Sequence, residues 1–233
     1  MSPTANPVGG NRKEVWIPMY APAPPAQPAL ALAPVEIAST TPSPGAAPLG
    51  RATATALHVR KARLNVLDGR RVSVAGTLSP GLSGRPVDLQ AMGPHGWREI
   101  AHTRTGAAGR FRLRYTPHAT GSRRVRLRFA GDGYDLPAHR VLGRLNVFRL
   151  AGASWYGGGG SLACGGSLSS STLGVANKTL PCGTLVTLRY GRRSVRVPVV
   201  DRGPYVAGRE FDLTEATKQA LGFGDTGEVW STR

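Results

Sequence analysis

Val199-Val200-Asp201-Arg202-Gly203-Pro204-Tyr205 places an aspartate at the end of an apolar strand, immediately before a Gly-Pro turn. The segment Glu210-Phe211-Asp212-Leu213-Thr214 brings a second aspartate eleven positions later, just before a predicted short helix. Two acids at strand ends can share one cleft, and carboxyl groups in a cleft perform the cleavage of polysaccharides. Asp201 and Asp212 are therefore the candidate catalytic acids; taken singly, Asp201 would be a turn residue and Asp212 an acid that stabilises the helix N-terminus.

The residues around these acids predict a small β-barrel. Leu185–Leu188 turns at Gly191-Arg192-Arg193 into Val195–Val199, which predicts a hairpin with Pro198 at an edge or a bulge. A short helix is expected to begin after Thr214 as its N-terminal cap and to end at Gly222. Mostly β-structure with one or two short helices is typical of a small barrel.

The chain has two cysteines, Cys164 and Cys182, in a Gly/Ser-rich setting. They are either a disulfide or two unrelated thiols. All five histidines lie between residues 51 and 150, so we expect no metal site, and no motif calls for a cofactor. A disulfide would add about 3 kcal/mol of stability in the chain-entropy model. It would also imply an extracytoplasmic location, which we expect for this protein.

Residues 1–50 are rich in Pro, Ala, Ser and Thr, and predict a disordered N-terminal tether. No clean signal peptide is visible, because prolines interrupt the apolar stretch that follows Arg12-Lys13. No apolar run is long enough for a transmembrane helix.

Apolar and polar residues alternate with period two in segments of residues 51–150. Phe111, Leu113 and Tyr115 share one face and the arginines between them share the other; Val125, Leu127 and Phe129 repeat this pattern. The turn signals between the predicted strands are Leu67-Asp68-Gly69, Ser79-Pro80-Gly81, Gly93-Pro94, Gly106–Gly109 and Gly131-Asp132-Gly133. Short strands between such turns predict a β-sandwich, and the segment resembles a bacterial immunoglobulin-like module.

The charge is concentrated in this same segment. The chain carries 30 basic and 13 acidic residues, and residues 51–150 hold 19 of the former and 5 of the latter. Nucleic acid is one candidate partner, but no nucleic-acid-binding motif accompanies the charge. An acidic cell envelope fits the same charge, and so does a merely solvated sheet face. If the strands around residues 110–115 and 124–129 pair, six guanidinium groups share one surface.

Five motifs follow one another in the last eighty or so residues. They are Ala153-Ser154-Trp155-Tyr156-Gly157, Ala163-Cys164-Gly165-Gly166, Asn177–Thr184, Val200–Tyr205 and Phe211–Thr214. In this order they resemble the RlpA-like (rare lipoprotein A) six-stranded double-psi β-barrel, whose wider relatives include expansins. The resemblance covers residues 151–233. It implies a protein that acts on bacterial wall glycan, and some members are lytic transglycosylases.

The resemblance assigns roles to individual residues. Asp201 matches the family's candidate acid, and Asp212 matches the essential aspartate of expansin-like barrels. Transglycosylase-type members carry a histidine where this chain has Asn177, and a glutamate upstream that this chain lacks. The residues expected to line a substrate groove are Ser154, Tyr156, Asn177, Arg202 and Tyr205.

Three functions are compatible with this sequence. A lytic transglycosylase can use one carboxyl group, because the sugar's own hydroxyl replaces water as the nucleophile. An expansin-like protein would bind peptidoglycan or another wall polysaccharide without cleaving it. A polyanion or nucleic-acid binder would act through the arginine-rich module, for which anionic wall polymers are the candidate partner.

Overall fold

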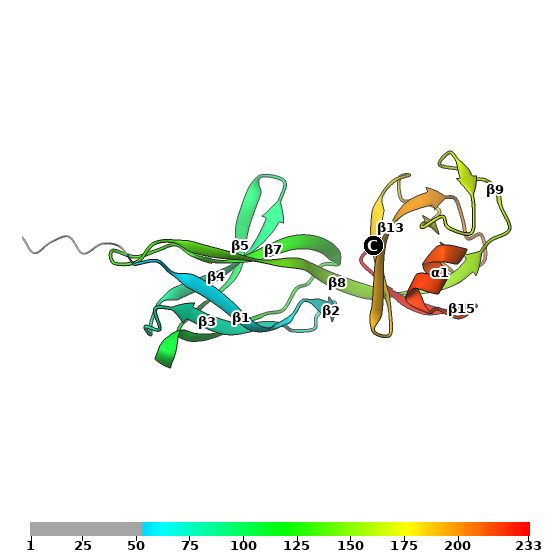
Figure 1. Ribbon diagram of the computed structural model, residues 1–233. Helices are drawn as coiled ribbons and strands as arrows, with labels where there is room; N and C mark the ends of the chain where they lie inside the picture. The colour runs from blue at the N-terminus through cyan, green and yellow to red at the C-terminus, as the bar shows by residue number, and fades with distance from the viewer. Residues whose placement is uncertain (1–52) are drawn as a thin grey trace, which may run out of the picture. The chain divides into compact units, whose positions relative to one another are not determined.

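The computed structural model describes residues 53–233, which form two groups of strands and one α-helix (Figure 1). The first elements are β1 (Ala56–Arg63), β2 (Asn65–Leu67), β3 (Val72–Ser79), β4 (Pro86–Gly93), β5 (Gly96–Arg104), the 3-10 turn η1 (Ala107–Gly109), β6 (Arg110–Tyr115) and β7 (Gly121–Phe129). The others are β8 (Ala138–Tyr156), β9 (Gly160–Ser161), β10 (Ser167–Leu168), β11 (Val175–Ala176), β12 (Leu185–Tyr190), β13 (Arg193–Asp201), β14 (Phe211–Thr214), α1 (Glu215–Leu221) and β15 (Thr226–Ser231). The tether predicted for residues 1–50 lies outside the described residues.

The first group of strands is a sandwich of two sheets. β1, β3 and β6 form one sheet in that order, while β8, β7, β4 and β5 are neighbours in the other, with β2 paired to β8. The predicted alternation is confirmed, because Leu113, Leu127 and Phe129 are fully buried and the arginines of β6 are exposed. Every predicted turn separates two strands.

The pairing considered for the two arginine-rich strands does not occur. Arg112 of β6 lies opposite Ala75 of β3, whereas Arg126 of β7 lies opposite Gln90 of β4. β6 and β7 therefore belong to different sheets, and their six arginines do not share one surface. A period-two pattern specifies which face of a strand is buried, but it does not specify the neighbouring strand.

The second group of strands closes into the six-stranded double-psi barrel that the motifs predicted. Its order is β8-β15-β12-β13-β11-β14, and β14 pairs with β8 to complete the ring. Phe211, Leu213 and Val229 are among the buried residues at its centre. The hairpin β12–β13 is confirmed, and Pro198 lies next to an irregular pairing between β13 and β11.

The helix α1 begins after Thr214, as expected, although the Thr214 hydroxyl donates to the Gly174 carbonyl instead of capping the helix. Gly222 ends the helix in the left-handed region, at φ +64°, where glycine is favoured. α1 has seven residues. Among residues 53–233, no helix is long and apolar enough to cross a membrane.

β8 belongs to both groups of strands. Its first part pairs with β7 and β2, and its last part pairs with β15 and β14. Val147 contributes to the hydrophobic core of the sandwich, and Ala151 contributes to that of the barrel. The expected boundary at residues 150/151 therefore falls inside one continuous strand.

Candidate active site

The barrel brings the two aspartates onto strands that flank β11, one on each side. Ala176 of β11 pairs with Asp201 of β13 on one side and with Asp212 of β14 on the other. Asp212 in turn pairs with Ser154 of β8. Because adjacent strands lie about 4.8 Å apart, the Cα atoms of the two aspartates are separated by roughly 10 Å. Asp201, Asp212 and Ser154 thus form one row across four strands.

Backbone hydrogen bonds fix the Asp201 carboxylate. Its Oδ1 accepts the N–H of Ala163 at 2.9 Å and the N–H of Arg202 at 2.8 Å. The first bond attaches the loop before Cys164 to the end of β13, and Cys164 N–H adds a bond of 3.1 Å to the Val200 carbonyl. Asp201 thus holds the turn after β13 through Oδ1, while the Tyr156 side chain lies close to the same carboxylate.

Arg202 faces away from Asp201. Its guanidinium donates to the carbonyl oxygens of Asn177 at 3.0 Å and Leu180 at 2.9 Å, and to Cys182 Sγ at 3.1 Å. Within the described chain, Arg202 makes no ion pair with Asp201. These donations hold the loop of residues 177–182, and a contact of Arg202 with substrate stays a prediction.

Asn177 holds the same loop through its side chain. Its Oδ1 accepts the N–H groups of Thr179 at 3.1 Å and Leu180 at 2.8 Å, and its Nδ2 donates to the Glu210 carbonyl at 2.9 Å. The side chain is buried. Asn177 therefore orders the wall of the site, and its contact with substrate also stays a prediction.

Cys164 and Cys182 form a disulfide, as expected, with an S–S distance of 2.04 Å. One sulfur belongs to the loop that donates to Asp201, and the other belongs to the loop held by Arg202 and Asn177. The covalent bond thus joins the two loops beside Asp201. A cross-link of this sequence separation contributes about 3 kcal/mol of stability by restricting the unfolded chain.

Ser154 and Arg209 hold Asp212 in place. The Ser154 hydroxyl donates to Asp212 Oδ1, and Arg209 Nη1 donates to the Ser154 hydroxyl at 3.3 Å. Ser154 is only 3% exposed. Its contacts link the Arg209 cation to the second aspartate, and its contact with substrate stays a prediction.

A close approach of backbone brings Arg209 to this position. A Cβ atom on Gly152 would collide with the Gly208 carbonyl, so glycine is required where residues 208–210 cross β8. The Glu210 N–H donates to the Gly152 carbonyl at 2.8 Å, and the Glu210 carboxylate pairs with Arg149, at 2.9 Å between Oε1 and Nη1. These contacts attach the segment before β14 to the last part of β8.

Tyr156 lies near both aspartates. Burial is the main reason that its pKa is raised, and the charge and nearby side chain of Asp201 and then the charge of Asp212 raise it further. The hydroxyl is buried and makes no hydrogen bond of regular geometry with residues 53–233. A neutral phenol therefore lies near both carboxylates.

The other two aromatic candidates differ in exposure. Trp155 donates from Nε1 to Asp225 Oδ1 at 2.9 Å, and Lys218 Nζ lies 3.7 Å from its ring centroid. Trp155 is therefore engaged by contacts with residues at or just beyond α1. Tyr205 is 81% exposed after the Gly-Pro turn and can stack on a sugar ring.

The sequence of this barrel is similar to that of known proteins. The sequence model of a family described as "Lytic transglycolase" matches residues 150–230. The probable endolytic peptidoglycan transglycosylase RlpA of Synechocystis sp. is 38% identical over 107 residues, covering 40% of this chain and 33% of that protein. Its counterpart in Aquifex aeolicus is 45% identical over 76 residues, covering 30% of this chain and 33% of that protein.

Residues 150–230 form an RlpA-like barrel. The chain spans about a third of the length of these two relatives. Among solved structures, the Streptomyces papain inhibitor (SPI) matches with 25% identity and a TM-score of 0.30, over 36% of this chain and 91% of that one.

The RlpA-like barrel contains one functional candidate that sequence reasoning missed. Arg209 lies in the irregular segment between β13 and β14, where no strand or helix pattern indicates the direction of a side chain. The sequence indicates its proximity to the site only through its position three residues before Asp212. Within residues 53–233, no three side chains of His, Cys, Asp or Glu come together as a metal-ligand set.

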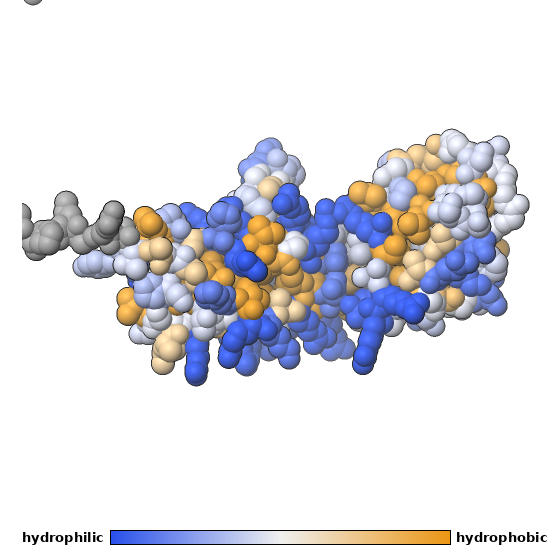
Figure 2. Space-filling model, viewed as in Figure 1, coloured by the Kyte–Doolittle hydropathy of each residue, from blue (hydrophilic) through white to orange (hydrophobic). Residues whose placement is uncertain are grey.

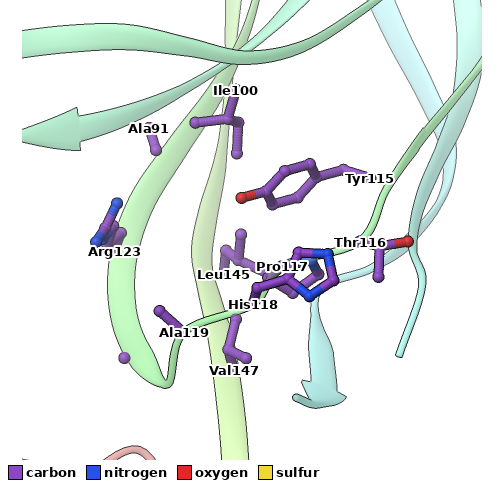
Figure 3. Close-up of a pocket in the computed structure, with 11 residues that line it drawn as sticks. Ala91, Ile100, Tyr115, Thr116, Pro117, His118, Ala119, Arg123, Leu145 and Val147 are labelled. Atoms are coloured by element: carbon purple, nitrogen blue, oxygen red, sulfur yellow. The ribbon is translucent and has the colours of Figure 1, made fainter. Parts of the chain in front are cut away.

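A separate hollow of about 320 Å³ lies in the sandwich (Figure 3). Figure 3 shows the Tyr115 ring, Ile100 and Leu145 around it, with His118 on the adjoining loop and Arg123 on the other side. None of its lining residues belongs to the RlpA-like barrel, so it is distinct from the aspartate row.

Proposed function

We propose that this protein acts outside the cytoplasm on bacterial peptidoglycan, as an RlpA-like lytic transglycosylase with Asp201 as the acid and base. The names of the matched relatives support this substrate, and the match of residues 150–230 supports this reaction class. The observation that carries the proposal is the row that holds Asp201 and Asp212 on either side of β11, near the buried phenol of Tyr156.

The reaction requires one proton to be given and one to be taken. Asp201 protonates the glycosidic oxygen as the bond from that oxygen to the anomeric carbon breaks. The 6-hydroxyl of the same sugar then attacks the anomeric carbon and returns its proton to Asp201, which yields a 1,6-anhydro product. Two backbone N–H groups orient Asp201 through Oδ1, so that Oδ2 can face the sugar.

Asp212 and Tyr156 have supporting roles in this mechanism. The Asp212 carboxylate places negative charge near a transition state with oxocarbenium character. The Tyr156 phenol is protonated at neutral pH, and its raised pKa extends this to alkaline pH, so it can donate a hydrogen bond to Asp201 or to a sugar oxygen. Tyr205 offers an exposed ring for stacking on the glycan.

The extracytoplasmic location is supported by the disulfide between Cys164 and Cys182, because such bonds persist in oxidising compartments. We also propose that the basic sandwich contacts anionic polymers of the cell wall, in keeping with its concentration of arginine.

A second function, glycan binding without cleavage as in expansins, is favoured by Asn177. This residue replaces the histidine expected in transglycosylase-type members, and its amide cannot titrate. The Asn177 side chain is already engaged with Thr179, Leu180 and Glu210. This function predicts sedimentation with the wall but no product.

Product analysis separates the two functions. Purified protein is incubated with peptide-stripped wall glycan, and 1,6-anhydro sugars are measured by mass spectrometry. We expect anhydro products from the native chain and none from Asp201→Asn. Glu228→Gln is the matched control, because it removes an exposed acid of the same barrel from β15. Wall binding without anhydro product from the native chain would reject the enzymatic proposal and leave the expansin-like one.

A further inference from the structure

The outer face of the sheet β1-β3-β6 is a groove walled by cations. Two rows cross this sheet, each with a small residue between two cations: Arg63–Ser73–Arg114 and Lys61–Ala75–Arg112. Together with Arg71 these residues line a hollow of about 330 Å³, called here the cationic groove. Ser73 and Ala75 form its floor along the central strand. Figure 2 shows hydrophilic side chains projecting from the sandwich around β1 and β3.

The charges of the cationic groove are not neutralised within the described chain. Its five basic residues are exposed, and no acidic residue lines it. None of the five makes a salt bridge or donates a side-chain hydrogen bond to any of residues 53–233. Five like charges in one hollow repel one another, and a bound anion would relieve this repulsion.

In the other sheet of the sandwich, two arginines have partners within the protein. Arg126 donates from Nε to Gln90 Oε1 at 2.8 Å and lies 4.4 Å from the centroid of the Trp97 ring. Arg128 lies 3.9 Å from the Asp88 carboxylate. Two arginines of β7 thus have partners within the sandwich, whereas none of the five cations of the cationic groove has one among residues 53–233.

The spacing of the cationic groove fits a linear polymer. Side chains on one face of a strand repeat every two residues, about 6.7 Å, so each wall presents charges at that interval. The two walls belong to strands on either side of β3, roughly 10 Å apart between Cα atoms. A glycerol-phosphate repeat has the same number of backbone bonds as two amino-acid residues, so successive phosphates can meet successive rows.

We infer that the cationic groove binds a polyol-phosphate chain of the cell wall, lying along β3 between the two walls. Arginine supplies four of the five cations, and its planar fork matches phosphate oxygens better than a lysine ammonium does. Single-stranded nucleic acid is held largely by stacking of its bases on aromatic side chains, and no aromatic residue lines the groove. A polymer with phosphates but no bases fits this surface best.

This inference rests on the proposed wall-directed function for the source of the polymer, but it is tested separately. Binding of the full chain to synthetic poly(glycerol phosphate) is measured by calorimetry over a series of salt concentrations. The groove variant is Arg112→Gln with Arg114→Gln. The matched control is Arg126→Gln with Arg128→Gln, which removes the same charge from the other sheet.

The groove variant is expected to raise Kd at least tenfold and to reduce the slope of log Kd against log salt by about two, because two phosphate contacts are lost. The control is expected to stay within threefold with an unchanged slope. Lys61→Gln with Arg63→Gln alters the opposite wall and must reproduce the loss, which guards against misfolding of the first variant. Equal losses in groove and control variants would overturn the inference.

Two further probes decide the ligand chemistry. Poly-glutamate tests for a carboxylate polymer, and single-stranded DNA tests for nucleic acid; equal or tighter binding of either one would overturn the inference. Cleavage of peptide-stripped glycan, which carries no polyol phosphate, is expected to be unchanged in the groove variant. Asp201→Asn is expected to bind poly(glycerol phosphate) as the native chain does. Failure of the groove inference and failure of the proposed enzymatic function therefore give different results.

Discussion

The aspartate row of the barrel and the cationic groove of the sandwich both gather polar side chains on neighbouring strands, but they hold them in opposite ways. In the barrel, Asp201 and Asp212 each have donors that fix one carboxylate oxygen. In the groove, Arg112 and Arg114 extend into solvent without a partner among the described residues. Cleavage of a single bond requires catalytic groups in a fixed geometry. Binding of a long polyanion requires only cationic side chains that are free to adjust to the phosphates.

The supporting contacts differ in the same manner. A disulfide and the side chains of Arg202 and Asn177 hold two loops beside Asp201. The groove is supported only by the pairing of β1, β3 and β6 and by the core beneath it. Removing a contact should therefore matter much more in the barrel than in the groove.

The largest difference is expected from the disulfide. Replacing Cys164 and Cys182 together by serine should lower the free energy of unfolding by about 3 kcal/mol, because the unfolded chain regains the entropy of the open loop. Denaturant titration measures the loss. Hydrogen exchange should show faster exchange for residues 162–165 and 177–182 while the amides of β3 and β6 keep their protection. An unchanged free energy of unfolding would contradict this prediction and show that non-covalent contacts alone hold the two loops.

A smaller effect is expected from Ser154→Ala. Asp212 would lose a buried donor, and a hydrogen bond to a charged group is worth about 1.5–3 kcal/mol. If the barrel cleaves glycan, kcat should fall roughly 10- to 100-fold with little change in KM, since Ser154 positions a carboxylate and does not face the sugar. The exposed Ser161→Ala is the control. A rise in KM alone would instead indicate direct contact with substrate.

The two sheet faces of the sandwich should differ by about 1 kcal/mol. Arg126→Ala removes the bond to Gln90 and the stacking on Trp97, so we expect a loss of about that size in unfolding free energy. Arg112→Ala removes an unpartnered charge and should change stability by less than about 0.5 kcal/mol. Thermal unfolding of both variants measures the difference, and equal losses would contradict the contrast between the faces.

The last effect concerns Tyr156 and is confined to alkaline pH. Its folded pKa is raised above the ordinary value near 10, so the folded chain keeps this proton when the unfolded chain has released it. The resulting stability is present below pH 10 and declines as the pH rises above that value. Tyr156→Phe should therefore lose less stability than the native chain between neutral and strongly alkaline pH. The exposed Tyr205→Phe should follow the native curve, and if Tyr156→Phe did so too, the environment assigned to Tyr156 would be wrong.

The sequence predicted strands and turns better than it predicted contacts. The alternation of Phe111 and Leu113 with arginine specified the buried face, and the ordered motifs specified the barrel. The alternation does not specify which strands are neighbours. For this reason β6 and β7 were considered as partners, although they lie in different sheets. The direction of Arg202 and the contact of Arg209 with Ser154 depend on irregular loops, and no periodicity indicates where their side chains point.

The continuous strand β8 limits how this protein can vary in length. A single residue inserted after Phe148 would turn every later side chain of β8 to the opposite face. Ala151 and Ala153 would leave the barrel core, and Ser154 would leave Asp212, although the pairing with β7 upstream would be untouched. Insertions or deletions at this junction therefore preserve the alternation on both sides in steps of two residues, and a single inserted residue would need a β-bulge such as the one where β8 pairs with β7.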